Sequence, residues 1–160
     1  MTRFFTPIWG LLVAGALATI AFDFFGQVLA PASGFAQLAP VGLANASIKA
    51  VFGAGYRPAA EGLHLVAGLI AYPLGWLLVA RPIWQATLPK LSVVVPAIAY
   101  GIVLWVFALY VMAHLVAGMK PFLGFTGITW VALWGHIVYA VVAVGVLEFR
   151  GSTRFNTAAA

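Results

Sequence analysis

Residues 128–148 have the sequence ITWVALWGHIVYAVVAVGVLE, in which a single histidine, His136, interrupts a long apolar run. A membrane-spanning helix needs about 20 mostly apolar residues, so this stretch predicts one. Ionisable side chains cost free energy inside a bilayer, and they usually face the bundle interior and mark a functional site. The stretch therefore predicts both a membrane fold and the kind of residue on which function depends.

Three further apolar runs precede this one, and each is bounded by proline, glycine or a charged residue. The four predicted spans cover residues 7–30, 60–80, 91–117 and 128–148. Only 7% of the residues are charged, against about a quarter in a soluble domain. We predict an all-α, antiparallel up-down bundle of four transmembrane helices in a single domain, residues 1–150, with the lipid bilayer as its surroundings.

The first run is too long for the apolar core of a cleaved signal peptide, so we keep it as a span. Basic residues in short flanks set the orientation of membrane helices. Both termini and the connection between the second and third spans carry five basic residues, against three in the other two connections. This bias predicts cytoplasmic termini. Residues 151–160 are predicted to form a disordered cytoplasmic tail.

The first external connection, residues 31–58, is long, and long connections in compact proteins are often functional. We predict a short helix over residues 41–52, lying on the membrane surface. Two alternatives are open for this connection: it caps the external end of the bundle, or it simply joins two spans.

Most of the histidines and carboxylates fall within the predicted spans. The candidate site consists of His64, His114, His136, Asp23 and Glu61, with Gln27 one helical turn beyond Asp23. Because successive spans alternate in direction, these groups all fall in the external half of the membrane at a rise of about 1.5 Å per residue. Small residues beside His64 and His136 predict that both point toward neighbouring helices.

Four hypotheses fit this set of side chains. Imidazole and carboxylate groups from several helices bind transition metals. The candidate metal ligands are His64, His114, His136 and Asp23. The spacing Glu61-x-x-His64 is found in bundle-core iron sites, but a second such motif is missing. Alternatively, His64 and His114, at similar depth, are the natural axial pair for haem b.

The third hypothesis is proton chemistry, since histidine changes charge near neutral pH and intramembrane His, Asp and Glu form proton relays. The cytoplasmic halves of the spans are almost purely apolar, which disfavours a channel and favours a sensor or an outward half-channel. The fourth hypothesis is that these groups only hydrogen-bond one another and hold the helices together. Such bonds contribute only ~0.6 kcal/mol each in membranes.

Several classes of function are excluded. Cysteine is absent, which rules out disulfides, thiol catalysis and cysteine-ligated metal centres. The eight basic residues are scattered, so nucleic acid is not an expected partner. The chain has no phosphate-binding glycine loop and no nucleophile elbow. We therefore predict that the protein is not an enzyme.

Three stretches in the later spans resemble the YagU-like family of bacterial inner-membrane proteins. They are Leu63-His64 opening a span that ends before Trp84-Gln85, Met112-Ala113-His114 followed by Gly118 and Pro121, and Trp134-Gly135-His136 with Arg150 closing the last span. The resemblance covers residues 60–150. It implies a bacterial inner-membrane location, a loose link with acid tolerance and no catalytic activity. The family has a basic residue about where Asp23 stands, so no role for Asp23 follows from the resemblance.

Together these observations predict a non-enzymatic, multi-pass inner-membrane protein linked to pH or acid stress. In it the histidines titrate and the carboxylates tune them. The alternative is a metal-binding or haem-b-binding accessory or redox subunit of a larger membrane complex. Association of the chain with copies of itself is also open.

Overall fold

The computed structural model describes the backbone of residues 2–158 and the side chains of residues 8–149. Within residues 2–158 the chain is helical and contains no β-strand. Four helices are long and apolar enough to cross a membrane: span 1 (Ile8–Ala32), span 2 (Arg57–Thr87), span 3 (Val94–Val116) and span 4 (Gly127–Phe149). The predicted fold class, an all-α protein with four membrane-spanning helices, is confirmed.

Several of the spans change helix type along their length. Span 1 contains the part of α1 (Thr2–Phe24) from Ile8 onward, the π-helical η1 (Phe25–Leu29) and α2 (Ala30–Ala32). Span 2 contains α4 (Arg57–Val66), the π-helical η2 (Ala67–Ala71), α5 (Tyr72–Gly75), the π-helical η3 (Trp76–Ala80) and α6 (Arg81–Thr87). Span 3 contains α7 (Val94–Val106) and the π-helical η4 (Phe107–Val116). Span 4 is the membrane part of α8 (Gly127–Ala158).

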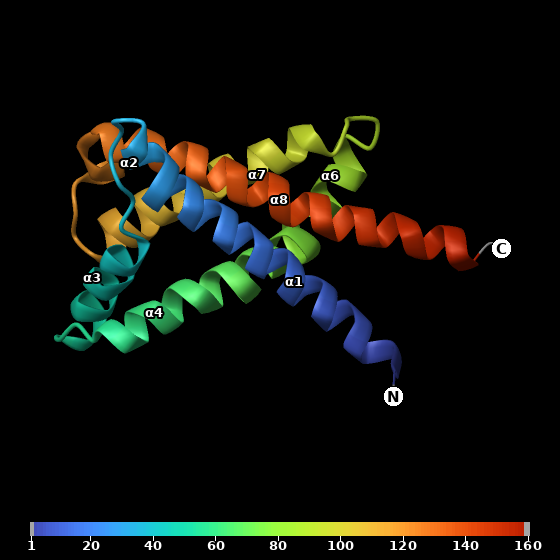
Figure 1. The fold of residues 1–160 in the computed structure, drawn as a ribbon, viewed down its shortest axis with the longest axis horizontal. Helices are drawn as coiled ribbons and strands as arrows, with labels where there is room; N and C mark the ends of the chain where they lie inside the picture. The colour runs from blue at the N-terminus through green and yellow to red at the C-terminus, as the bar shows by residue number, and fades with distance from the viewer. Residues whose placement is uncertain (1, 159–160) are drawn as a thin grey trace.

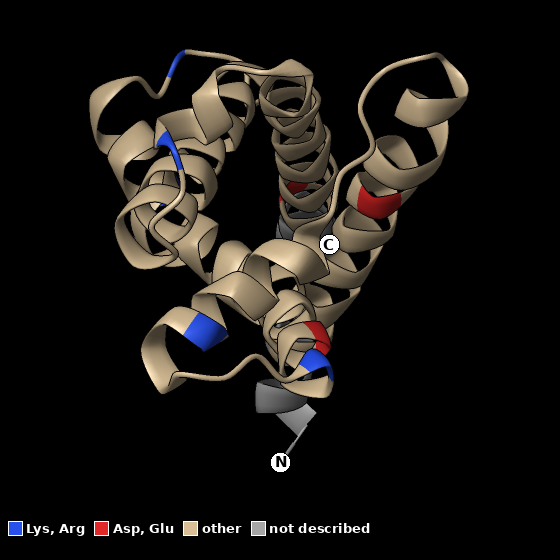
Figure 2. Ribbon diagram, turned by 90° about the vertical axis from the view of Figure 1, so that its left-hand side faces the viewer, with Lys and Arg blue, Asp and Glu red and all other residues tan. Residues whose placement is uncertain are grey.

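Two shorter helices lie between the spans: α3 (Pro40–Phe52) and the 3-10 turn η5 (Pro121–Gly124). The helix predicted over residues 41–52 is thus confirmed as α3. α8 packs along both α1 and α7, and α3 packs against α4 and η4. In Figure 1, α2 and α3 lie at one end of the molecule, opposite the end where the chain begins and ends. Figure 2 shows how few Lys, Arg, Asp and Glu residues the ribbon carries.

Two predicted boundaries differ from the structure by seven residues or more. Span 2 continues through Arg81 and Pro82 to Thr87, past the predicted end at residue 80. α8 continues through Gly151 as far as Ala158, where a disordered tail was predicted from residue 151. One glycine costs a helix only about 1 kcal/mol, so it does not by itself end the helix. Residues 159–160 of the predicted tail lie outside the described residues.

Prolines inside the spans explain three of the π-helical segments. η1, η2 and η3 end just before the dipeptides that contain Pro31, Pro73 and Pro82. After η2, for example, the Tyr72 N–H donates to the Ala67 carbonyl, five residues back. The next carbonyl, that of Gly68, would take its donor from residue 73, but proline has no N–H. Each such proline therefore leaves one carbonyl without a donor in its own helix.

Two of these carbonyls receive a donor from elsewhere in the chain. The Leu38 N–H donates to the Gly26 carbonyl over 2.9 Å, in the position left open by Pro31. The Tyr139 hydroxyl of α8 donates to the Gly68 carbonyl of η2. An unsatisfied backbone group in lipid costs several kcal/mol, so these bonds make prolines tolerable inside the spans. They also attach the first connection to span 1, and span 4 to span 2.

We expect Tyr139→Phe to lower the free energy of unfolding by ~0.6–1.7 kcal/mol, the range measured for hydrogen bonds in membrane proteins. The loss should be smaller in a Pro73→Ala background, because residue 73 then regains an N–H for the Gly68 carbonyl. Reversible unfolding in mixed micelles measures both. Tyr110→Phe is the matched control, since that residue is 39% exposed. An equal loss in both backgrounds would contradict the claim that Pro73 leaves the Gly68 carbonyl without a donor in its own helix.

Two glycines mark the places where helices approach most closely. A Cβ atom at Gly15 of α1 would collide with the backbone of Leu69 in η2. A Cβ atom at Gly101 of α7 would lie 2.7 Å from the Ile137 Cα and 2.8 Å from the His136 carbonyl oxygen. Small residues permit such backbone contact between membrane helices, where dispersion forces drive association. These two glycines therefore set the spacing of spans 1 and 2 and of spans 3 and 4.

We expect Gly15→Ala and Gly101→Ala each to destabilise the folded protein by about 1–3 kcal/mol, the usual cost of overpacking. Gly145→Ala in α8 is the matched control, because a Cβ atom there meets no atom within 4 Å. It should be neutral or stabilising, since alanine favours helix more than glycine does. Thermal unfolding in detergent compares the three, and equal behaviour would refute the close-approach argument.

Candidate functional site

Asp23 and His64 form a contact between spans 1 and 2. The His64 Nε2 atom lies 3.2 Å from both carboxylate oxygens of Asp23. The Gln27 side-chain amide, one turn further along span 1, donates to Asp23 Oδ1 over 2.8 Å. The His64 and Asp23 side chains are 17% and 33% exposed. We call this contact the Asp23–His64 pair; it is a partly buried contact between two ionisable side chains, and it joins two spans.

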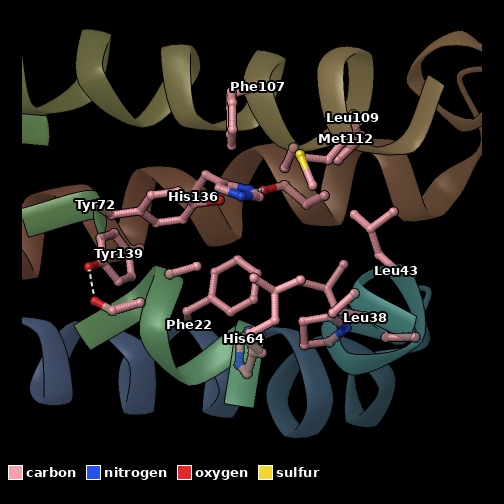
Figure 3. A pocket seen from close by; sticks show the side chains of 18 of the residues that line it. Phe22, Leu38, Leu43, His64, Tyr72, Phe107, Leu109, Met112, His136 and Tyr139 are labelled. Atoms are coloured by element: carbon pink, nitrogen blue, oxygen red, sulfur yellow. Dashed lines mark hydrogen bonds between the residues drawn. The ribbon is translucent and has the colours of Figure 1, made fainter. Parts of the chain in front are cut away.

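His136 lies near this pair but is separated from it by an aromatic ring. The Phe22 ring centroid is 5.1 Å from that of His136 and 6.3 Å from that of His64. Figure 3 shows Phe22 between the two histidines. The His136 Nδ1 atom lies 2.7 Å from the Ala132 carbonyl oxygen. A carbonyl only accepts, so Nδ1 carries the proton and Nε2 of the neutral ring is an acceptor.

Glu61 and His114 are held by partners of their own. Glu61 accepts a hydrogen bond from the Arg57 guanidinium over 3.0 Å, and its side chain is 51% exposed. His114 Nδ1 donates to the Met119 carbonyl over 2.7 Å, where the chain turns after span 3. Each has found its partner within five residues along the chain. Neither residue belongs to the Asp23–His64 pair.

The structure therefore divides the predicted site. Among the described side chains, no group of three or more His, Asp or Glu residues could hold a metal ion. The predicted ligand set of His64, His114, His136 and Asp23 is not supported, and the haem pair of His64 and His114 has no support either. The predicted cluster was based on the depth of each side chain in the membrane and on the helix face that carries it. These two properties place side chains at a similar level, but they do not specify which side chains are in contact.

A cavity of about 330 Å³ lies beside Asp23, with His64 in its wall, and it is lined by residues of all four spans and the first connection. Its wall is mostly aliphatic and aromatic. Polar side chains on the wall are Thr19, Ser47, His64, Tyr72, His136 and Tyr139. Figure 3 shows Leu38 and Leu43 at one side of this cavity and Tyr72 and Tyr139 at another. The first connection therefore forms part of the cavity wall, through α3 and the residues before it.

A second polar contact joins spans 2 and 4. The Arg81 Nε and Glu148 Oε1 atoms are 2.9 Å apart, and Arg81 Nη2 donates to Glu148 Oε2 over 3.1 Å. The Trp76 indole N–H donates to Glu148 Oε1 over 3.0 Å. No contact between Arg81 and Glu148 was predicted from the sequence, in which Arg81 follows the predicted end of span 2 and Glu148 ends span 4. A signal was available, because these opposite charges lie at the same predicted end of their spans.

No protein-family model, curated protein or solved structure matches this chain. The resemblance to the YagU-like family therefore stays a prediction. The geometry of the side chains is the basis of the functional proposal that follows.

We expect Arg81→Gln to destabilise the protein by at least about 1 kcal/mol more than Arg57→Gln. The Arg81 ion pair is 34% and 19% exposed, whereas the matched Arg57 pair is 84% and 51% exposed. Removing one partner of a buried pair leaves a costly charge, while exposed pairs contribute little. Unfolding in mixed micelles measures the difference. Equal losses would show that the Arg81–Glu148 contact adds nothing beyond a surface pair.

Proposed function

We propose that this protein is a non-enzymatic, multi-pass protein of the bacterial inner membrane that responds to pH. The Asp23–His64 pair is proposed as its proton-responsive element. The observation that carries the proposal is a contact of 3.2 Å between two ionisable side chains on different, mostly apolar spans. Ionisable groups are retained in membrane spans chiefly for function, because their insertion is costly.

The strength of this contact depends on its protons. With His64 protonated and Asp23 ionised, the two groups attract, and an apolar environment increases the attraction. With His64 neutral, the contact is reduced to a hydrogen bond and Asp23 carries an uncompensated charge. Acidification therefore tightens the contact between spans 1 and 2 as His64 gains a proton. Stronger acid weakens it again when Asp23 is protonated.

The other charged or polar groups near the pair are bonded to other partners, lie behind an aromatic ring or do not titrate, so the proposed response depends on Asp23 and His64. Arg57 and Glu61, on the same helix as His64, form an ion pair with each other. His136 on α8 is on the other side of the Phe22 ring. Gln27 is the other polar partner of Asp23, and its amide does not titrate. The pair is thus the element whose charge state governs the contact of spans 1 and 2.

The first connection is placed to transmit such a change. Leu38 is bonded to the Gly26 carbonyl, one turn beyond Asp23 on span 1. The helix that follows, α3, packs against α4, which carries His64. The connection is therefore attached to both helices that the pair joins. The bias of basic residues toward the opposite end supports a periplasmic position for the pair and cytoplasmic termini.

We expect acidification to narrow the distance distribution between spans 1 and 2 in the wild-type protein. Spin labels on Leu29→Cys and Tyr56→Cys report it, since both positions are exposed and the chain has no cysteine. His64→Gln and Asp23→Asn should abolish the pH response, because neither retains the ion pair. His114→Gln, whose histidine lies outside the pair, should respond as the wild type does.

The same variants are then compared for survival of acid-treated cells. His64→Gln should lose survival that His114→Gln keeps. The proposal fails if His64→Gln and Asp23→Asn, purified as folded protein, show the wild-type response at every pH.

A further inference from the structure

The cavity contains polar groups that its own protein does not fully use. Thr19 is 5% exposed and lines the cavity, and its hydroxyl oxygen, itself buried, has no hydrogen-bond partner. His136 is equally buried, and its Nδ1 proton is committed to the Ala132 carbonyl. Its Nε2 atom is therefore an acceptor on a ring that lines the cavity. A buried polar group without a partner costs free energy that a bound molecule would recover.

Aromatic rings enclose the same space. Tyr72, Tyr139, Phe107 and Phe22 all line the cavity, and Figure 3 shows them around His136. Tyr72 meets Phe107 and Tyr139 edge to face, at centroid distances of 6.5 and 5.6 Å. The Tyr139 hydroxyl is bonded to the Gly68 carbonyl, so this residue offers a ligand mainly its ring. Aromatic rings pack well against such edges and faces.

We infer that this cavity binds a lipophilic molecule with an aromatic hydroxyl, such as a phenol or a quinol. The ring lies among the aromatic side chains, and its hydroxyl donates to His136 Nε2. A cavity of about 330 Å³ with apolar walls and few polar groups has the character of a small-molecule site.

Other apolar occupants fit these observations less well. A bare acyl chain would leave the His136 Nε2 acceptor without a partner. A molecule that only accepts hydrogen bonds, such as a quinone or an ether, would leave this Nε2 acceptor without a donor. This inference goes beyond the proposed pH response, because it depends on His136 and not on the Asp23–His64 pair.

Binding of four probes to the protein in lipid nanodiscs tests the inference, with empty nanodiscs as blanks. Decylphenol and decylhydroquinone, kept reduced without oxygen, carry the hydroxyl. Decylbenzoquinone and the dimethyl ether of decylhydroquinone lack it. We expect the hydroxyl-bearing probes to bind roughly five- to tenfold more tightly, the effect of one buried hydrogen bond. Preference for decylhydroquinone over decylphenol would point to a membrane quinol, and equal binding to simple phenols.

Variants separate the hydrogen bond from the shape of the cavity. His136→Phe should reduce the affinity for decylphenol to that of the dimethyl ether, whereas His114→Phe, outside the cavity, should not. Ala108→Phe places a ring at a cavity-lining position and should abolish binding of all four probes. Equal binding of the phenol and the ether by the unchanged protein would overturn the inference, whatever the variants do. So would undiminished binding by a folded His136→Phe protein.

Discussion

The constraint on which this structure depends is that a backbone carbonyl surrounded by lipid must find a donor within the protein. Pro31 and Pro73 each remove such a donor, and the helix around each proline shifts into a π-helical segment. The freed carbonyls of Gly26 and Gly68 then take their donors from Leu38 and Tyr139. The missing donor in one span thereby leads to a specific hydrogen bond with another part of the chain, because a buried carbonyl without a donor would be costly.

Polar side chains add a second set of connections along span 2. His64 near its beginning meets Asp23 of span 1, and Arg81 near its end meets Glu148 of span 4. At a rise of about 1.5 Å per residue these two contacts are about 25 Å apart, close to the thickness of a hydrocarbon core. Span 2 is thus held near both ends by polar side chains and along its length by backbone contact at Gly15.

The cavity lies near the π-helical segment of span 2 and the Asp23–His64 pair. The π-helical segment η2 of span 2 and the return of the chain through α3 both line a space that the apolar side chains do not fill. His64 and His136 reach this space from different spans, and Phe22 lies between them. One histidine is paired with a carboxylate and the other with a backbone carbonyl. The two imidazoles therefore have different surroundings: the ring of His64 contacts a carboxylate of another span, and the ring of His136 holds its Nδ1 proton on a backbone carbonyl of its own helix.

Much of the fold follows from the sequence alone. The number of spans and their lipid surroundings depend on the length and composition of apolar runs, and α3 depends on a short local pattern. These are properties of neighbouring residues, so a single chain suffices to predict them. The end of span 2 did not follow, because Pro82 usually stops a helix, and here a π-helical segment accommodates it.

The partners of the polar side chains were decided only by the tertiary structure. Asp23 meets His64 across two spans, whereas Glu61 is held by Arg57 on its own helix and His114 by the Met119 carbonyl. All of these groups share a predicted level, so depth does not distinguish among them. Their pairing depends on helix rotation and on the separation of neighbouring helices, to within a few ångströms. Those quantities result from the packing of all four spans together, and no local pattern of residues encodes them.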